Sequence, residues 1–405
     1  MVPNLIEIEA AREAVLERVR PLPAEDVPID EALGRVAVEP VTSTDAVPGF
    51  DNSAMDGYAV RAPDIGEASE RSPAVLRVVD ESRAGHPAER ELAGGEAIAI
   101  STGAMVPAGA DAVVRVEDTA AADGQVEVRV PVEPGRNIRR AGEDTRPGDV
   151  VIEPGTELGA AELGVLASVG RSTVGCARPP AVHILTTGDE LQEPDEALQP
   201  GGIRNSNAHS LAALVKASGG LVVSSEIVRD DPDTTREALE RALAADVAIV
   251  SGGVSVGTHD HVRPALADLG VEEVFWGVAL RPGKPTWFGA RGSTLTYGLP
   301  GNPVSAIVTF LLFVRPAVRA MLGARDASTR ASAVLDADYE KPPGRAHLVR
   351  CRLELRDDGW HATPTGEQGS HVLTSMVGAD ALAMIPTAAE AVRAGERVGV
   401  ELLPR

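Results

Sequence analysis

Between residues 181 and 327 the sequence alternates between short apolar runs and amphipathic segments, and this alternation limits the fold more than any other feature. The apolar runs lie at 181–185, 221–228, 246–250 and 293–299, and segments with helical spacing such as 207–218 and 230–245 separate them. Strands that alternate with helices predict a parallel-rich sheet covered by helices on both faces. We therefore predict an α/β domain in this part of the chain.

Glycine-containing loops border the strands of this predicted sheet. They are TTGDE at 186–190, SGGVSVG at 251–257 and LPGNPVSA at 299–306. Ligands of such sheets bind at the carboxyl ends of the strands, and glycines let backbone N–H groups approach an anion. One such loop alone is equally well explained as a tight turn, but three together predict an anion-binding site. The candidate substrate-binding residues are Gly252, Gly253, Ser255, Gly257, Gly301 and Asn302.

Carboxylates gather at the same loops, where Glu190, Asp230 and Asp260 occur. Carboxylates that face a phosphate need a cation between them, and Mg²⁺ typically takes one or two carboxylates plus substrate phosphates. We predict that these three residues hold Mg²⁺. The alternative is that Asp230 and Asp260 cap the helices that begin there. The segment RPGKP at 281–285 adds Arg281 and Lys284 as nearby cations.

The rest of the chain lacks this regular alternation of strand-like and helix-like segments. Residues 4–20 show helical spacing, and a second helical pattern covers 160–170. Short Val-rich runs between Gly and Pro dominate 27–180, and the texture after 328 is again typical of β structure. Within this half, Asp56, Thr102 and Asp144 lie in polar segments that, taken one at a time, are best explained as turns.

Composition excludes several classes of protein. A formal charge of -22 repels nucleic acid and anionic membranes. We expect no membrane span, because no apolar run approaches the roughly 18 residues that one needs. The start of the chain lacks the order of a secretion signal, and two cysteines, Cys176 and Cys351, cannot form a disulfide framework. These features predict a cytoplasmic protein.

Taken together, the segments resemble one family, the molybdopterin molybdenumtransferases of molybdenum cofactor synthesis, called MoeA in bacteria. The resemblance covers nearly the whole chain. The matching motifs are PGFDNSAMDGYAVR, STGAMVPAGADAVV, GED at 142–144, TTGDEL, IRNSN, SGGVSVGTHD, RPGKP, LPGNPVSA and TGEQGSH at 365–371.

The resemblance implies a multi-domain α/β plus β architecture. An elongated first domain would consist of 1–45 and 145–178, with a β-rich domain inserted at 46–144. A molybdopterin-binding α/β domain would cover 179–327, and a β-barrel would cover 328–405. The family implies a homodimer with each site in a cleft between subunits.

The implied reaction joins molybdate to adenylylated molybdopterin and releases AMP with Mg²⁺. Carried over by position, the implied catalytic residues are Asp56, Thr102, Asp144, Glu190, Asp230, Asp260 and Lys284, with Arg350 and Ser370 as further substrate-binding residues. Lys284 and Arg350 would take the charge of the anion, and Asp56 and Thr102 would close the cleft from the other subunit. Implied partners are the molybdopterin adenylyltransferase and the molybdoenzymes that accept the product.

Position 281 departs from the family pattern, because Arg281 stands where relatives usually have Lys. Arginine keeps the charge but changes the geometry of the donors. Two rival functions remain. The α/β part alone resembles the adenylyltransferase of the preceding step, and the eukaryotic relative gephyrin uses this type of module as a scaffold.

Overall fold

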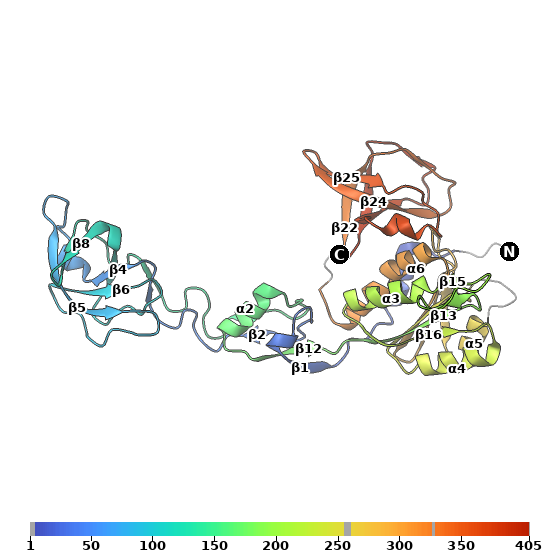
Figure 1. Cartoon of the computed structure of the whole chain (residues 1–405), viewed down its shortest axis with the longest axis horizontal. Helices are drawn as coiled ribbons and strands as arrows, with labels where there is room; N and C mark the ends of the chain where they lie inside the picture. The colour runs from blue at the N-terminus through green and yellow to red at the C-terminus, as the bar shows by residue number, and fades with distance from the viewer. Residues whose placement is uncertain (1–4, 255–260, 326–328, 405) are drawn as a thin grey trace.

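The computed structural model of the chain describes residues 5–254, 261–325 and 329–404. The molecule is long, and Figure 1 shows three regions along it. A β-rich region lies at one end, a small region that contains α2 lies in the middle, and an α/β region with a β-barrel beside it lies at the other end. The chain passes from the middle region out to the β-rich end and then returns.

A six-stranded sheet forms the centre of the α/β region. Its strand order is β16-β13-β17-β21-β20-β18; the first four strands run parallel, and the last two pairs are antiparallel. The strands are β13 (Ala181–Thr187), β16 (Leu221–Val228), β17 (Val247–Ser251), β18 (Glu272–Trp276), β20 (Trp287–Arg291) and β21 (Thr294–Leu299). The predicted parallel-rich sheet is confirmed. The strand order changes direction at β13, because β16 and β17, the next two strands of this sheet in the sequence, lie on opposite sides of it.

Helices cover both faces of this sheet. On one face they pack against a cluster that includes Val182 and Ile184, and on the other against a cluster that includes Leu185 and Val250. The split follows from the alternation of side chains along a strand. The first face carries α1 (Ile8–Leu16), α3 (Ser206–Ala217) and the continuous helix α6 (Pro303–Thr309), η4 (Phe310–Val314) and α7 (Arg315–Met321); the second carries α4 (Pro232–Ala242) and α5 (Val262–Asp268).

Helix α1 is shorter than the predicted span of 4–20. The N–H groups of Arg18 and Val19 bond to carbonyls only three residues back, so the chain tightens into turns after Leu16.

The helix Pro303–Met321 contradicts our expectation about apolar length. By length and composition it could cross a membrane, with a mean hydropathy of 1.6 in its most apolar window. However, 72% of that window is buried inside the protein, where it belongs to the largest core cluster. We therefore interpret it as the core helix of the α/β region.

Five strands after residue 329 close into a barrel, as predicted. Their order is β24-β25-β22-β28-β26, and β26 pairs back onto β24. The strands are β22 (Arg330–Leu335), β24 (Ala346–Arg356), β25 (Gly359–Pro364), β26 (Ala381–Ile385) and β28 (Arg397–Leu402). The short strand β19 (Leu280–Arg281) pairs in parallel with β24, so the RPGKP segment begins at the junction between the barrel and the α/β region.

The β-rich end contains a six-stranded sheet with the order β7-β4-β6-β5-β9-β8. Val60 and Ala97 enter one core cluster, whereas their sequence neighbours Ala59 and Ile98 enter another, so both faces of the sheet are covered. The strands are β4 (Gly57–Val60), β5 (Ala74–Ser82), β6 (Glu96–Ile100), β7 (Ala112–Arg115), β8 (Thr119–Ala122) and β9 (Gln125–Val128).

The middle region contains α2 (Ala160–Ser168) and two strand pairs. The pairs are β1 (Ala24–Pro28) with β12 (Thr173–Ala177), and β2 (Val41–Thr42) with β11 (Val150–Ile152). Each pair joins a strand before the β-rich region to one after it. The discontinuous first domain and the four domain boundaries stay a prediction.

The remaining elements are short. They are η1 (Ile29–Glu31), β3 (Asn52–Ser53), η2 (Ala62–Ile65), η3 (Val116–Asp118), β10 (Ile138–Arg139), β14 (Leu191–Gln192), β15 (Ile203–Arg204), β23 (Tyr339–Glu340), η5 (Leu373–Met376) and β27 (Ala391–Val392).

Candidate active site

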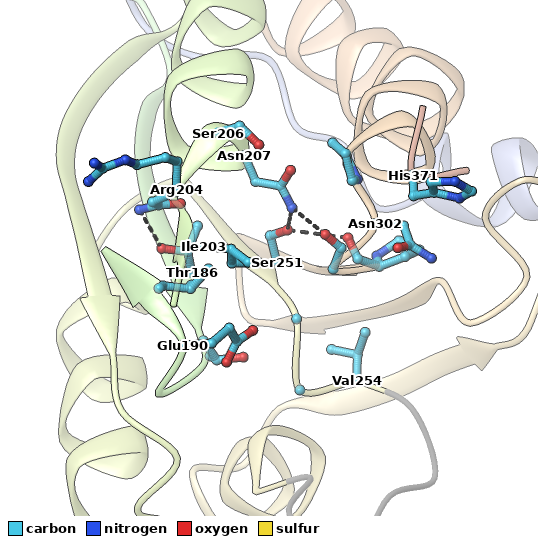
Figure 2. A pocket seen from close by; sticks show the side chains of 18 of the residues that line it. Thr186, Glu190, Ile203, Arg204, Ser206, Asn207, Ser251, Val254, Asn302 and His371 are labelled. Carbon is cyan, nitrogen blue, oxygen red and sulfur yellow. Dashed lines mark hydrogen bonds between the residues drawn. The ribbon is translucent and has the colours of Figure 1, made fainter. Parts of the chain in front are cut away.

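A cavity of about 720 Å³ opens at the carboxyl edge of the α/β sheet (Figure 2). Its walls are the segments that follow β13, β17 and β21, together with the first turn of α3. His371 and Leu373 reach it from the barrel region. The cavity lies where the strand order changes direction, which is where ligands bind in open α/β sheets.

The loop after β17 supplies bare backbone to the cavity wall. Gly252 and Gly253 have φ values of 98° and 60°, in the left-handed region that favours glycine. A Cβ on Gly252 would lie 2.8 Å from the carbonyl oxygen of Thr187, so a side chain would also clash with the end of β13. The structure therefore places two of the predicted anion-binding glycines in the wall of the cavity.

Asn207 connects the loops around the cavity, as Figure 2 shows. Its Nδ2 donates to Ser251 Oγ at 2.9 Å and to the Gly301 carbonyl at 2.8 Å. Ser251 Oγ in turn donates to the Pro300 carbonyl at 3.3 Å. One side chain from α3 thus fixes the spacing between the ends of β17 and β21.

Asn205 anchors the start of α3 beside the end of β13. Its Oδ1 accepts from the Ala208 N–H at 3.3 Å as the helix N-cap, and its Nδ2 donates to Thr186 Oγ1 at 3.0 Å. Asn205 is buried, so both of its polar atoms are satisfied inside the protein. This cap presents the first turn of α3 to the cavity.

Glu190 lines the cavity from the loop after β13. A Cβ on Gly188 would lie 2.5 Å from Glu190 Oε2, and Gly188 has a φ of 150°. Only glycine at 188 therefore leaves room for the carboxylate to fold back over the loop.

Asp230 lies at the same edge but does not line the cavity. Its N–H donates to Asp189 Oδ1 at 3.2 Å, and Arg229 donates to the Asp189 carbonyl at 2.6 Å. The alternative role of Asp230 as a helix cap is wrong, because the N-cap of α4 is Asp231, whose Oδ1 accepts from the Thr234 N–H at 2.9 Å. Asp230 therefore does not act as the N-cap of α4.

Among the described residues, no group of three His, Cys, Asp or Glu side chains is close enough to hold a metal ion without other ligands. Asp260, the third predicted Mg²⁺ ligand, lies outside the described residues, as do Ser255 and Gly257. Of the predicted Mg²⁺ ligands, Glu190 lines the cavity and Asp230 does not; carboxylate oxygens of this kind are ligands that Mg²⁺ prefers.

Asn302 and Ser370 join the α/β region to the barrel region. Asn302 Nδ2 donates to Ser370 Oγ at 3.1 Å, and the Val304 N–H donates to the Ser370 carbonyl at 3.2 Å. Gly301 and Asn302 line the cavity, so the contact between Asn302 and Ser370 brings the segment 365–371 to the edge of the cavity.

Arg350 supports that segment from inside. It is 0% exposed, and its guanidinium donates to the carbonyls of Glu367 and Gly369 at 3.3 and 3.1 Å and to Ser375 Oγ at 3.1 Å. Burial lowers the pKa of the Arg350 guanidinium. No carboxylate pairs with it among the described residues, and Arg350 is not one of the residues that line the cavity.

The RPGKP segment runs along the same junction. Pro285 lines the cavity, while the side chains of Arg281 and Lys284 are exposed. Arg281 is close enough to His347 on β24 to help lower its pKa to about 4, after the larger effect of burial. Both predicted cations therefore stand near the cavity and not in its wall.

Asp56 and Thr102 meet each other at the far end of the molecule. Asp56 Oδ1 accepts from the Thr102 N–H at 2.7 Å and from Thr102 Oγ1 at 3.0 Å, and both residues are exposed. Asp144 is also exposed on the return from the β-rich region. Within one chain, Figure 1 places all three segments far from the α/β sheet. The structure thus brings the predicted residues together in two separate groups.

Sequence reasoning did not select Asn207 or Ser251, although both stand in quoted motifs. The signal for Asn207 was the pair of asparagines in IRNSN at the start of a predicted helix. One asparagine of such a pair would cap the helix, and the other would face the ends of the strands. Thr186 and His371 also line the cavity and were not selected, although they stand in the quoted motifs TTGDE and TGEQGSH.

Comparisons with known proteins cover almost the whole chain. The MoeA N-terminal region (domain I and II) matches residues 6–170, the probable molybdopterin binding domain matches 183–320, and the MoeA C-terminal region (domain IV) matches 332–403. A molybdopterin molybdenumtransferase of Haemophilus influenzae is 36% identical, with 98% of both chains covered. The chain belongs to the MoeA family.

Other members of the MoeA family agree with this assignment. A molybdopterin molybdenumtransferase of Nostoc sp. is 37% identical, with 92% of this chain and 87% of the relative covered. A crystal structure of the molybdopterin biosynthesis MoeA protein from Pyrococcus horikoshii OT3 superimposes with a TM-score of 0.85 at 32% identity, covering 99% of this chain and 100% of the other. The family resemblance seen in the sequence motifs is confirmed.

Proposed function

We propose that this chain is a molybdopterin molybdenumtransferase that inserts molybdate into adenylylated molybdopterin and releases AMP. The observation that carries the proposal is the cavity at the carboxyl edge of the sheet, in a chain that matches enzymes of this name over nearly its full length. Its volume of about 720 Å³ suits a ligand larger than a single oxyanion. The bare glycine backbone at 252 and 253 suits the phosphate groups of that ligand.

Cations at the junction with the barrel would hold the molybdate. Arg350 offers a buried charge that has no carboxylate partner among the described residues, and Lys284 and Arg281 are exposed in the segment whose Pro285 lines the cavity. Of the 38 Lys and Arg residues only Lys216, Lys284 and Lys341 are lysines. In a chain that uses arginine for nearly every cation, the lysine at 284 supports a role for a compact ammonium group, whereas Arg281 fits a position where charge is sufficient.

We further propose that Mg²⁺ is held by Glu190, Asp230 and Asp260 together with the phosphates of the substrate. When bound, it would neutralise charge on the phosphoanhydride that is cleaved. The chain's own residues would then position the ligand, with Asn207 keeping the loops around it at a fixed spacing and Asn302 linking them to Ser370.

The separation of Asp56, Thr102 and Asp144 from the cavity supports a homodimer with shared sites. The segments around Asp56 also carry large exposed apolar side chains, of which Met55 is 43% and Met105 is 44% exposed. Exposed methionines beside a polar pair are suited to contact with another protein surface. We propose that this end of one chain closes over the cavity of its partner.

The proposed reaction also needs an adenylyltransferase to supply the substrate and molybdoenzymes to accept the product. Transient contact with both, in the cytoplasm, is part of the proposal.

The test is AMP release from adenylylated molybdopterin, measured with Mg²⁺ and with or without molybdate. We expect release that depends on molybdate, and a folded protein that releases no AMP would overturn the proposal. ATP consumption with unmodified molybdopterin would instead favour the adenylyltransferase. Ligand binding without turnover would favour a scaffold role.

A further inference from the structure

A second cavity, of about 380 Å³, lies where three parts of the molecule meet, and none of its lining residues belongs to the candidate active site. Helices α1 and α7 form its walls, β28 of the barrel contributes another side, and Glu157 reaches it from the middle region. Four arginines line it, namely Arg12, Arg315, Arg319 and Arg325. Such a concentration of positive charge is unexpected in a chain with a net charge of -22.

Most of these charges have partners within the described residues. Arg319 pairs with Glu157 at 2.7 Å, and Arg325 lies 3.8 Å from Glu153 and donates to the Pro154 carbonyl at 3.1 Å. Glu401, which also lines the cavity and is 3% exposed, lies 3.7 Å from Arg12 and 3.5 Å from Arg330. Glu157 and Glu401, the acids among the described lining residues, thus each have an arginine partner.

Arg315 is the exception. Its guanidinium makes no hydrogen bond and no ion pair with any described residue, although the residue is only partly exposed. Burial lowers the pKa of Arg315; the nearby carboxylates of Glu401 and Glu157 oppose this effect, and Arg319 adds to it. Arg12 Nη1 is also buried without a hydrogen bond; its ion-pair partner Glu401 Oε2, 3.7 Å away, likewise makes no hydrogen bond. Buried charged donors of this kind are costly unless a partner completes them.

We propose that this cavity binds an anion of the phosphate class, with Arg315 and Arg12 as its principal ligands and Arg319 at its edge. The planar guanidinium groups match the tetrahedral oxygens of such an anion. The volume exceeds that of one phosphate, so the cavity has room for a larger ligand. Inorganic phosphate, pyrophosphate and a nucleotide all carry the phosphate group that these arginines would bind. The bound anion would connect α1 with α7. It would also connect them with the middle region, because Arg319 at its edge pairs with Glu157 of that region.

The experiment is a calorimetric titration of the full chain with inorganic phosphate, at constant ionic strength set with chloride. We expect saturable binding that weakens at least tenfold in Arg315→Gln, as expected for loss of a charged hydrogen-bond donor. The matched control is Arg236→Gln, because Arg236 is an exposed arginine on α4 with one weak ion pair, and it should bind as the unmodified chain does. Parallel titrations with AMP and pyrophosphate identify the natural source of the phosphate group.

Phosphate can also enter the candidate active site, so the titration is repeated in a Lys284→Ala background. Binding that persists there and disappears on adding Arg315→Gln supports the second cavity. Ala320→Asp is an independent variant, because it adds a carboxylate to the cavity wall and keeps all four arginines; it should also abolish binding. The absence of saturable binding, or equal affinity in the unmodified chain and in folded Arg315→Gln and Ala320→Asp variants, overturns the proposal.

Discussion

The cavity end and the β-rich end of this molecule both carry predicted functional residues, but they hold them in different ways. At the cavity, loops that are far apart in sequence are brought together by the parallel sheet and fixed by Asn207 and Asn205. At the β-rich end, Asp56 and Thr102 form one exposed pair at the start of β4 and after β6. The cavity end thus surrounds a hollow with residues from several loops, whereas Asp56 and Thr102 contact each other at the protein surface.

The largest expected effect tests whether the two ends form one site. Asp56→Ala and Glu190→Ala should each lose activity by on the order of 10²–10³, as for loss of one electrostatic contact in a transition state. When the two inactive variants are refolded together, about half of the dimers are mixed and each has one intact site, so roughly a quarter of full activity should return. AMP release from the mixture is the measurement.

Mass spectrometry must show that mixed dimers have formed. If they have and no activity returns, the two ends do not share a site between chains. The loss of activity on substitution at either end would then have to be explained by a movement that brings the two ends of one chain together.

Next in size is the loss of the buried cation at the cavity end. Arg350→Met removes the donor to the Gly369 carbonyl and to the buried Ser375 hydroxyl, and a buried group left unpaired costs about 1–3 kcal/mol of stability. We expect a lower thermal midpoint and a higher KM for molybdate. Arg350→Lys, which restores charge without the fork, should recover only part of the molybdate affinity; full recovery would show that charge alone matters.

Arg281 should give a smaller effect, because it is exposed at the junction. We expect Arg281→Ala to lose about tenfold in AMP release, in line with one partly solvated charge contact, and Arg281→Lys to retain most of the activity. Measurements at two salt concentrations separate charge from geometry, since screening weakens an exposed charge contact. An unaltered Arg281→Ala enzyme would remove this residue from the site.

The smallest effect on activity, but a clear one on stability, concerns His347 at the barrel junction. Its pKa is lowered to about 4 because the side chain is buried and faces Arg281, Lys341 and Arg345. Below pH about 6.5 the His347 imidazole therefore binds a proton in the unfolded chain but stays neutral in the folded chain. The free energy of unfolding consequently falls as pH decreases toward 4. The loss amounts to about 3 kcal/mol, and His347→Gln should remove it from urea-unfolding curves between pH 7 and 4.5.

His361 in the same barrel provides the opposite control. Asp336 and Asp358 hold its ring nitrogens at 2.7 and 2.8 Å and raise its pKa. Its contribution to stability is present below the unfolded pKa and is lost as pH rises through the raised value. If His347→Gln and His361→Gln change the pH dependence in the same direction, the assignment of His347 is wrong.

The sequence by itself determined the strands and helices of the α/β region and the places of its glycine loops. These follow from local periodicity and from backbone conformations that only glycine adopts, as at Gly188 and Gly252, so they can be read from neighbouring residues. The motifs also determined the family, and they placed Asp56 and Thr102 among the functional candidates before any contact between them was known.

The tertiary structure alone decided which of these residues meet. Asn207 reaches both Ser251 and Gly301 because β17 and β21 are neighbours in the sheet, and no local pattern specifies that order. The same holds for Arg350, whose burial and lack of a carboxylate depend on how the barrel packs against the α/β region. The helix Pro303–Met321 could be assigned to the core only once its neighbours were known. In each case the deciding energy comes from desolvation and long-range packing, which residues distant in sequence supply.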